Sequence, residues 1–175
     1  MDESDKARGL LALMLLHDSR RDARLNPTGE LVLLNEQDST LWDQEKIHEG
    51  ITILDKVLAF YAPGPYQTQA VISALHAEAP TADATDWHQI VALYNSLAAM
   101  TQSMVVEVNL AVAVAMARSP QEGLQMLRRV QTYCIERSSA RLPPMLTSVH
   151  STCAAAVRSV LIIQQRVDEM LQDFP

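Results

Sequence analysis

Basic residues, glycine and phenylalanine are scarce in this chain. Its 175 residues include 14 Lys and Arg against 21 Asp and Glu, which gives a formal net charge of −7. Such a surface repels phosphate and lacks the basic footprint of a nucleic-acid binder, so we expect no direct binding to DNA. The five glycines and two phenylalanines, beside many alanines and leucines, favour an all-α fold.

Long apolar runs and closely spaced cysteines are missing as well. The apolar run from Leu10 to Leu16 is far too short to span a bilayer, and the N-terminus lacks the layout of a signal peptide. Cys134 and Cys153 lie in Ala- and Val-rich helical sequence, which indicates two buried, reduced thiols rather than a disulfide framework. We therefore expect a soluble, cytoplasmic protein with no membrane contact.

Apolar residues at helical spacing predict a series of helices. The first runs from about Ser4 to Ser19. Leu10, Leu11, Met14 and Leu15 form one face and Leu13 and Leu16 widen it, so we expect this helix to be buried on most sides. A non-helical excursion near residues 25–34 follows, because Asn-Pro-Thr-Gly separates two short extended runs there. Further helices are predicted around 47–58, from Tyr66, after Asp86, over 104–117, from Pro120 and from Pro143 onward. Helix pairs then begin at intervals of roughly 40 residues, as in stacked helix-pair repeats.

Motifs for catalysis or cofactor binding do not stand out. His76-Ala77-Glu78 matches the H-x-E element of zinc deaminases, but those enzymes also need a downstream P-C-x-x-C, and the two cysteines here are far apart. A helix-packing histidine is the better interpretation of His76. We expect no enzyme, no metal and no cofactor, and a metal-dependent hydrolase is the weakest alternative.

An acidic stretch between residues 35 and 47 differs from the Ala- and Leu-rich helices around it. Its candidate contact residues are Glu36, Gln37, Asp38, Trp42 and Asp43. A helix N-terminus explains part of it, with Asp38 or Thr40 as a cap, Asp43 in the first turn and Trp42 on the core. It does not explain three consecutive polar residues from Glu36 to Asp38. That cluster either satisfies buried backbone groups in an irregular loop or faces a partner.

The same stretch carries a resemblance. "LLNEQDSTLWD" resembles the acidic-Gln-Asp-Arg-x-x-Trp-Asp motif in the C-terminal extension of one group of extracytoplasmic-function RNA polymerase sigma factors. "ARGLLALMLLHDSRRDAR", "GPYQTQAVISALHAEAPTADATDW", "VVEVNLAVAVA" and "SPQEGL" resemble further segments of that extension, in the same order. The similarity covers about Ala7 to Leu127. Two features depart from the pattern: Ser39 stands in place of the motif's arginine, and the expected final repeat is hard to find beyond Arg128.

The resemblance implies a fold, a role and partners. The fold would be a tetratricopeptide-like array of antiparallel helix pairs forming a single domain over residues 1–175, with the promoter-binding sigma domains absent from this chain. The role would be to control promoter-specific transcription initiation through contacts with the sigma core domains, RNA polymerase or another regulatory protein. The five candidate residues would make that contact or shape its loop. The alternative is a free-standing helical-repeat adaptor that binds a peptide or protein partner.

Overall fold

The part of the chain that the structure describes is helical, apart from one isolated antiparallel bridge. This computed structural model describes residues 3–32, 34–59, 63–81 and 84–139, with the backbone alone at residue 35 and at residues 134–139. The predicted all-α class is therefore confirmed. The predicted helix from Pro143 and the residue Cys153 lie outside the described residues.

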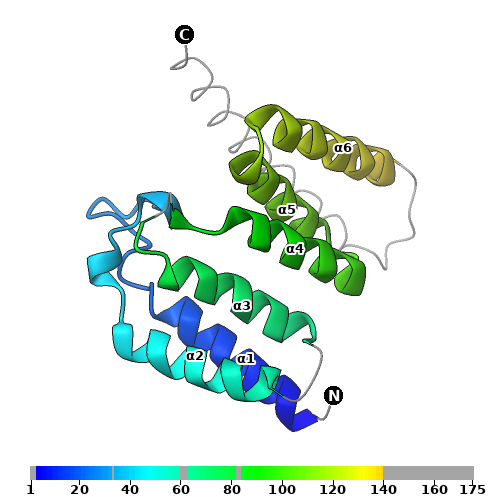
Figure 1. Ribbon diagram of the computed structural model, residues 1–175. Coiled ribbons are helices and arrows are strands. Elements are labelled where there is room, and N and C mark those ends of the chain that lie inside the picture. The colour runs from blue at the N-terminus through cyan, green and yellow to red at the C-terminus, as the bar shows by residue number, and fades with distance from the viewer. Residues whose placement is uncertain (1–2, 33, 60–62, 82–83, 140–175) are drawn as a thin grey trace. The chain divides into compact units, whose positions relative to one another are not determined.

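Contacts between residues divide the chain into two compact units, Met1–Asp86 and Trp87–Pro175. Within each unit, successive helices run in opposite directions, as expected for an array of antiparallel helices (Figure 1). None of the helices in the described ranges is both long enough and apolar enough to cross a membrane. A single domain over the whole chain stays a prediction.

The described residues of the first unit form α-helices and short 3₁₀ helices. They are α1 (Glu3–Asp18), η1 (Leu34–Glu36), η2 (Ser39–Leu41), α2 (Gln44–Leu58) and α3 (Pro65–Glu78). Helix α1 packs against both α2 and α3. Pro65 occupies the first position of α3, where its missing N–H costs no helical hydrogen bond. The sequence therefore fixes the start of α3 by backbone chemistry alone.

The buried face of α1 is narrower than predicted: Leu13 and Leu16 are buried as expected, but the helix is not buried on most sides. Ala12, Leu13 and Leu16 are buried, whereas Leu10 and Met14 of the predicted face are 38% and 60% exposed. Small residues explain the difference, because α1 packs against α2 and α3 and approaches them closely where its own residues are small. A Cβ atom on Gly9 would come within 2.6 Å of the Gln67 side chain of α3. Close packing at small residues, rather than the densest run of leucines, decides which face turns inward.

The predicted excursion is present between α1 and η1. Leu25 and Leu31 form the antiparallel bridge, flanked by backbone hydrogen bonds from Asn26 N to Glu30 O and from Val32 N to Arg24 O, both 2.9 Å long. Gly29 has a φ of 84°, a left-handed conformation that glycine adopts without strain. The excursion is thus a small, hydrogen-bonded hairpin.

The second unit contains α4 (Trp87–Thr101), α5 (Met104–Ala117) and α6 (Pro120–Ser139). Helix α5 packs on both α4 and α6, and its bounds match the prediction. The predicted capping box at α6 is confirmed, because Ser119 Oγ accepts a hydrogen bond from Glu122 N and donates one to Glu122 Oε1, both at 3.3 Å. Contacts group α3 with α1 and α2, so the pair predicted to begin at Tyr66 does not form within one unit.

Candidate protein-contact site at residues 36 to 43

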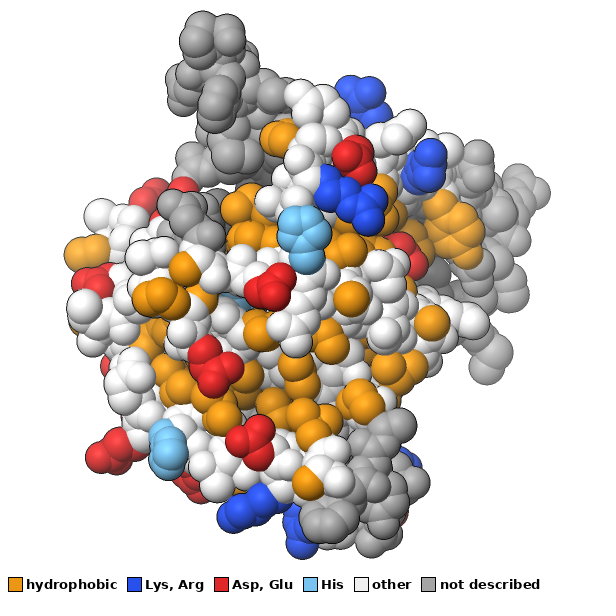
Figure 2. All heavy atoms as spheres, viewed as in Figure 1, with side chains coloured by type: hydrophobic (Ala, Val, Ile, Leu, Met, Phe, Trp, Pro, Cys, Tyr) orange, Lys and Arg blue, Asp and Glu red, His pale blue; other side chains and the backbone are white. Residues whose placement is uncertain are grey.

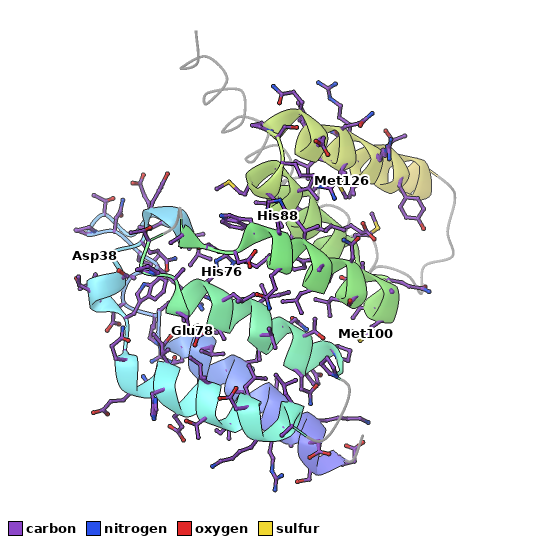
Figure 3. The ribbon with its side chains drawn as sticks, in the orientation of Figure 1. Asp38, His76, Glu78, His88, Met100 and Met126 are labelled. Atoms are coloured by element: carbon purple, nitrogen blue, oxygen red, sulfur yellow. The ribbon has the colours of Figure 1, made fainter. Side chains whose placement is uncertain are left out.

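The candidate contact residues lie on the connection between the hairpin and α2. Glu36 ends η1, Asp38 caps η2, and Asp43 caps α2, so two short 3₁₀ helices lead directly into the start of α2. Figure 3 labels Asp38 among these loops, at the end of the first unit where α2 begins. The sequence order therefore places the five residues in one compact loop region, but it does not give them the same surroundings.

Gln37 braces the loop from inside. Its Nε2 donates a hydrogen bond to the carbonyl oxygen of Val32, 3.2 Å away, and so ties the connection to the hairpin. Its Oε1 is buried and accepts no hydrogen bond from the described part of the protein. Of the two readings that the sequence left open, the amide of Gln37 follows the first, since it satisfies a backbone carbonyl of an irregular loop.

Asp38 has an exposed carboxylate that is held in place. Its Oδ1 accepts hydrogen bonds from the backbone N of Thr40 at 2.9 Å and from Thr40 Oγ1 at 2.6 Å. These bonds lower the pKa of Asp38 below its ordinary value, because they favour the charged form. The side chain of Ser39, in the position of the motif's arginine, is exposed. Asp38 and the neighbouring exposed Glu36 thus present negative charge on this loop.

Trp42 belongs to the hydrophobic core of the first unit. Its side chain is 9% exposed and is one of the cluster that includes Leu16, Ile47 and Leu54. The guanidinium carbon of Arg20 lies 5.8 Å from the centroid of the indole ring, within the range of a cation–π contact. Trp42 therefore anchors the loop on the core, and little of its side chain is accessible to a partner.

Asp43 fixes the start of α2. Its carboxylate accepts a hydrogen bond from Lys46 N at 3.1 Å, and its own N–H donates to the carbonyl of Ser19 at 2.9 Å. Lys46 Nζ lies 3.1 Å from Asp43 Oδ2 and 3.0 Å from Asp18 Oδ2, so one ammonium links the two helices α1 and α2. The backbone hydrogen bond from Lys46 is the main reason that the pKa of Asp43 is lowered. Asp43 is an N-cap and a brace between helices.

Arg20 is a residue that sequence reasoning missed. It is 8% exposed although it is charged, and it lies over Trp42. Burial, and next the positive charge of Arg20, lower the pKa of His76 to about 4. Burial is also the main cause of the lowered pKa of His17, with Arg20 and Arg24 adding to it. The stretch "DSRRDAR" does not indicate that Arg20 is buried, because its hydrophobicity pattern does not distinguish one arginine from another.

His76 and Glu78 share the last turn of α3 (Figure 3). Across the described ranges, no group of three or more His, Cys, Asp or Glu side chains is placed to hold a metal ion. The lowered pKa of His76 keeps its imidazole neutral near pH 7, as expected for a histidine packed among other side chains.

Comparison with known proteins adds two matches. Residues 1–58 match the model of a family of unknown function, DUF6596. The chain is 44% identical to a protein of Rhizobium meliloti (strain 1021) that is described as uncharacterized, over 119 residues or 68% of the chain. The aligned segment makes up 28% of that relative, so the chain spans little more than a quarter of its length. No solved structure matches the chain.

Proposed function

We propose that this chain is the regulatory C-terminal part of an extracytoplasmic-function sigma factor and acts in the cytoplasm through protein–protein contacts. It would control promoter-specific transcription initiation by contacting the sigma core domains, RNA polymerase or another regulatory protein. The proposal includes no catalysis and no cofactor. It rests on the ordered set of motifs that resemble the sigma-factor extension, and the DNA-binding step would belong to other domains, in keeping with the net charge of −7.

One structural observation carries the proposal. The motif that resembles the sigma-factor extension divides into inward-facing and outward-facing residues. Trp42 and Asp43 anchor the loop on the core and on α2, and Gln37 ties it to the hairpin. Glu36 and Asp38 are exposed on the anchored loop. Asp38 caps η2 through one carboxylate oxygen, and a cap needs no net charge, so the charge of the exposed carboxylates is the feature that a partner would recognise.

The length of the relative agrees with a role inside a larger protein. Most of the Rhizobium meliloti protein lies outside the aligned segment, so a homologous segment occurs there beside other sequence. Antiparallel helices in successive units are a common scaffold for protein contacts, because stacked helices leave long exposed faces. Both points support a helical module that works next to other domains.

The test is transcription in vitro. The complete reading frame that encodes the chain would be expressed, combined with core RNA polymerase and assayed on its own promoter, with and without the 175 residues. We expect the charge variant Glu36→Gln/Asp38→Asn to lower transcription severely, since asparagine keeps the cap of η2 and loses only the charge. The matched control is Glu45→Gln/Glu49→Gln on α2, which removes the same charge elsewhere.

Two outcomes would contradict the proposal. Transcription that is unaffected by removal of the 175 residues would show that the chain does not regulate initiation. A reading frame that encodes no promoter-binding domain would favour the free-standing adaptor instead.

A further inference from the structure

Two leucines of the hairpin form an exposed apolar pair. Leu25 and Leu31 are directly opposite each other in the antiparallel bridge, so their side chains project from the same face. They are 54% and 82% exposed. Single exposed leucines are common on protein surfaces, but a pair placed side by side at the tip of an ordered element is a feature to be explained.

Hydrogen bonds hold this hairpin in one conformation. Asn26 Oδ1 accepts from Thr28 N at 3.0 Å, from Glu30 N at 2.8 Å and from Thr28 Oγ1 at 2.7 Å. Asn26 Nδ2 in turn donates to Glu30 Oε2 at 2.9 Å. The exposure of the leucines is therefore a property of the folded hairpin. A partner that binds them loses little free energy to ordering of the loop, because the loop is already ordered.

The hairpin and the acidic loop are neighbours in the first unit. Gln37 links them through its hydrogen bond to Val32 O, and Leu41 on η2 adds a further leucine that is 53% exposed. We define the leucine–acid surface as Leu25, Leu31 and Leu41 together with Glu30, Glu36 and Asp38. Hydrogen bonds from Asn26 and Thr28 lower the pKa of Glu30, so that carboxylate is charged at neutral pH. In the view of Figure 2, hydrophobic and acidic side chains intermingle at the end of the unit that carries these loops.

Charge decides what kind of partner fits. The first unit holds 15 acidic against seven basic residues, whereas the second holds six against seven, so the excess of acidic residues lies in the unit that carries the leucine–acid surface. This charge opposes nucleic acids and anionic membranes. It attracts Lys and Arg, and the leucines add apolar area that a purely ionic contact would not need.

We propose that the leucine–acid surface binds a protein segment that carries aliphatic side chains flanked by Lys or Arg. The inference deepens the proposed function, on which it rests, by naming the surface and the chemistry of the partner segment. Leu25 and Leu31 supply the apolar contact, and Glu30, Glu36 and Asp38 supply the charge. The partner's aliphatic groups cover the leucine pair, and its cations lie beside the carboxylates.

The test uses the full 175-residue chain and a short fluorescent peptide of alternating leucine and lysine as the probe. We expect Leu25→Gln/Leu31→Gln to weaken the binding of this peptide about tenfold or more, since burial of even one leucine is worth that factor. The matched control is Leu11→Gln/Met14→Gln, which removes two exposed apolar side chains from α1. Melting temperatures of both variants should stay close to that of the wild type, because all four residues are exposed.

The ionic part of the contact is tested separately. Glu30→Gln/Glu36→Gln should reduce the salt dependence of peptide binding, whereas Glu45→Gln/Glu49→Gln on α2 should leave most of it in place. A peptide of alternating leucine and glutamate should not bind.

Several results would overturn the inference. The surface is wrong if the α1 control weakens binding as much as the hairpin variant, or if the leucine–glutamate peptide binds equally well. Binding of duplex DNA that the hairpin substitutions abolish would assign the surface to another class of partner. Failure of the proposed function looks different: transcription would not depend on the chain, while peptide binding would still depend on Leu25 and Leu31.

Discussion

Replacing Trp42 with alanine should show how much the buried part of the acidic loop contributes to stability, for comparison with its more exposed residues. The indole is 9% exposed and packs in the core of the first unit, and truncation of a buried tryptophan costs about 3–5 kcal/mol of unfolding free energy. Loss of the contact with Arg20, whose guanidinium carbon lies 5.8 Å from the ring centroid, adds about 0.5–1 kcal/mol. Because typical domains are stable by only about 5–15 kcal/mol, Trp42→Ala should remove a large share of the stability.

The comparison variant is Gln37→Ala/Asp38→Ala. Gln37 contributes one hydrogen bond of 3.2 Å to Val32 O, worth about 0.5–1.5 kcal/mol, and its substitution also removes the buried Oε1 atom, which offsets part of that loss. Asp38 caps only the short helix η2 from an exposed position, and loss of a cap costs about 1 kcal/mol. The double variant should therefore lose roughly 1–2 kcal/mol, less than half the effect of Trp42→Ala.

Urea unfolding of both variants gives the free energies, and in vitro transcription with the protein encoded by the complete reading frame tests the proposed function. We expect Gln37→Ala/Asp38→Ala to remain folded at the assay temperature and yet to lose most of its transcription. If this variant unfolds as readily as Trp42→Ala, the cluster is an internal brace, and the assignment of its exposed part to a partner is refuted.

Three further predictions follow from other parts of the chain. Gly123→Ala should destabilise the second unit by about 1–3 kcal/mol despite the better helix propensity of alanine, because the new Cβ would lie 2.5 Å from Ala115 Cβ; a raised melting temperature would contradict this. Since the pKa of His76 is lowered to about 4, the unfolded chain takes up its proton first as the pH falls below about 6.5. Stability should consequently drop by about 1–2 kcal/mol between pH 7 and pH 5, and His76→Gln should reduce that drop in urea titrations. The 175-residue chain should not shift labelled duplex DNA at physiological salt, in keeping with its net charge of −7, and a salt-sensitive shift would refute this.

Helix bounds were the most predictable part of the fold, because they depend on local chemistry. The capping box at Ser119 and Glu122 and the proline at the first position of α3 each mark a start that the structure confirms. The hairpin was predictable for the same reason, since Asn-Pro-Thr-Gly combines the fixed φ of proline with a glycine that can adopt the positive φ of a turn. Each of these signals is contained within a few consecutive residues, so no knowledge of the tertiary structure was needed.

The buried face of α1 was not predictable from hydrophobicity. All seven residues from Leu10 to Leu16 are leucine, methionine or alanine, so every side of the helix offers apolar surface. The choice among the sides depends on which residues let α3 and α2 approach, and these are Gly9, next to Gln67, and Ala12. That information lies in pairs of residues distant in sequence, as in the hydrogen bond from Gln67 Nε2 to Asp5 O, 62 positions apart and 2.8 Å long.

The candidate site likewise shows that the sequence alone does not tell which residues are buried and which are exposed. A conspicuous motif draws attention to all its residues equally, but its members divide by physical role once the chain is folded. The indole of Trp42 is buried and Asp43 is tied to Lys46 and Ser19, so substitutions there disturb the scaffold first. Leu25 and Leu31, outside the motif and unremarkable by type, are the residues that offer apolar area to solvent beside the acidic loop. A motif therefore draws attention to a region of the chain, while the atoms that a partner could touch are known only once the folded structure shows which of its side chains are buried.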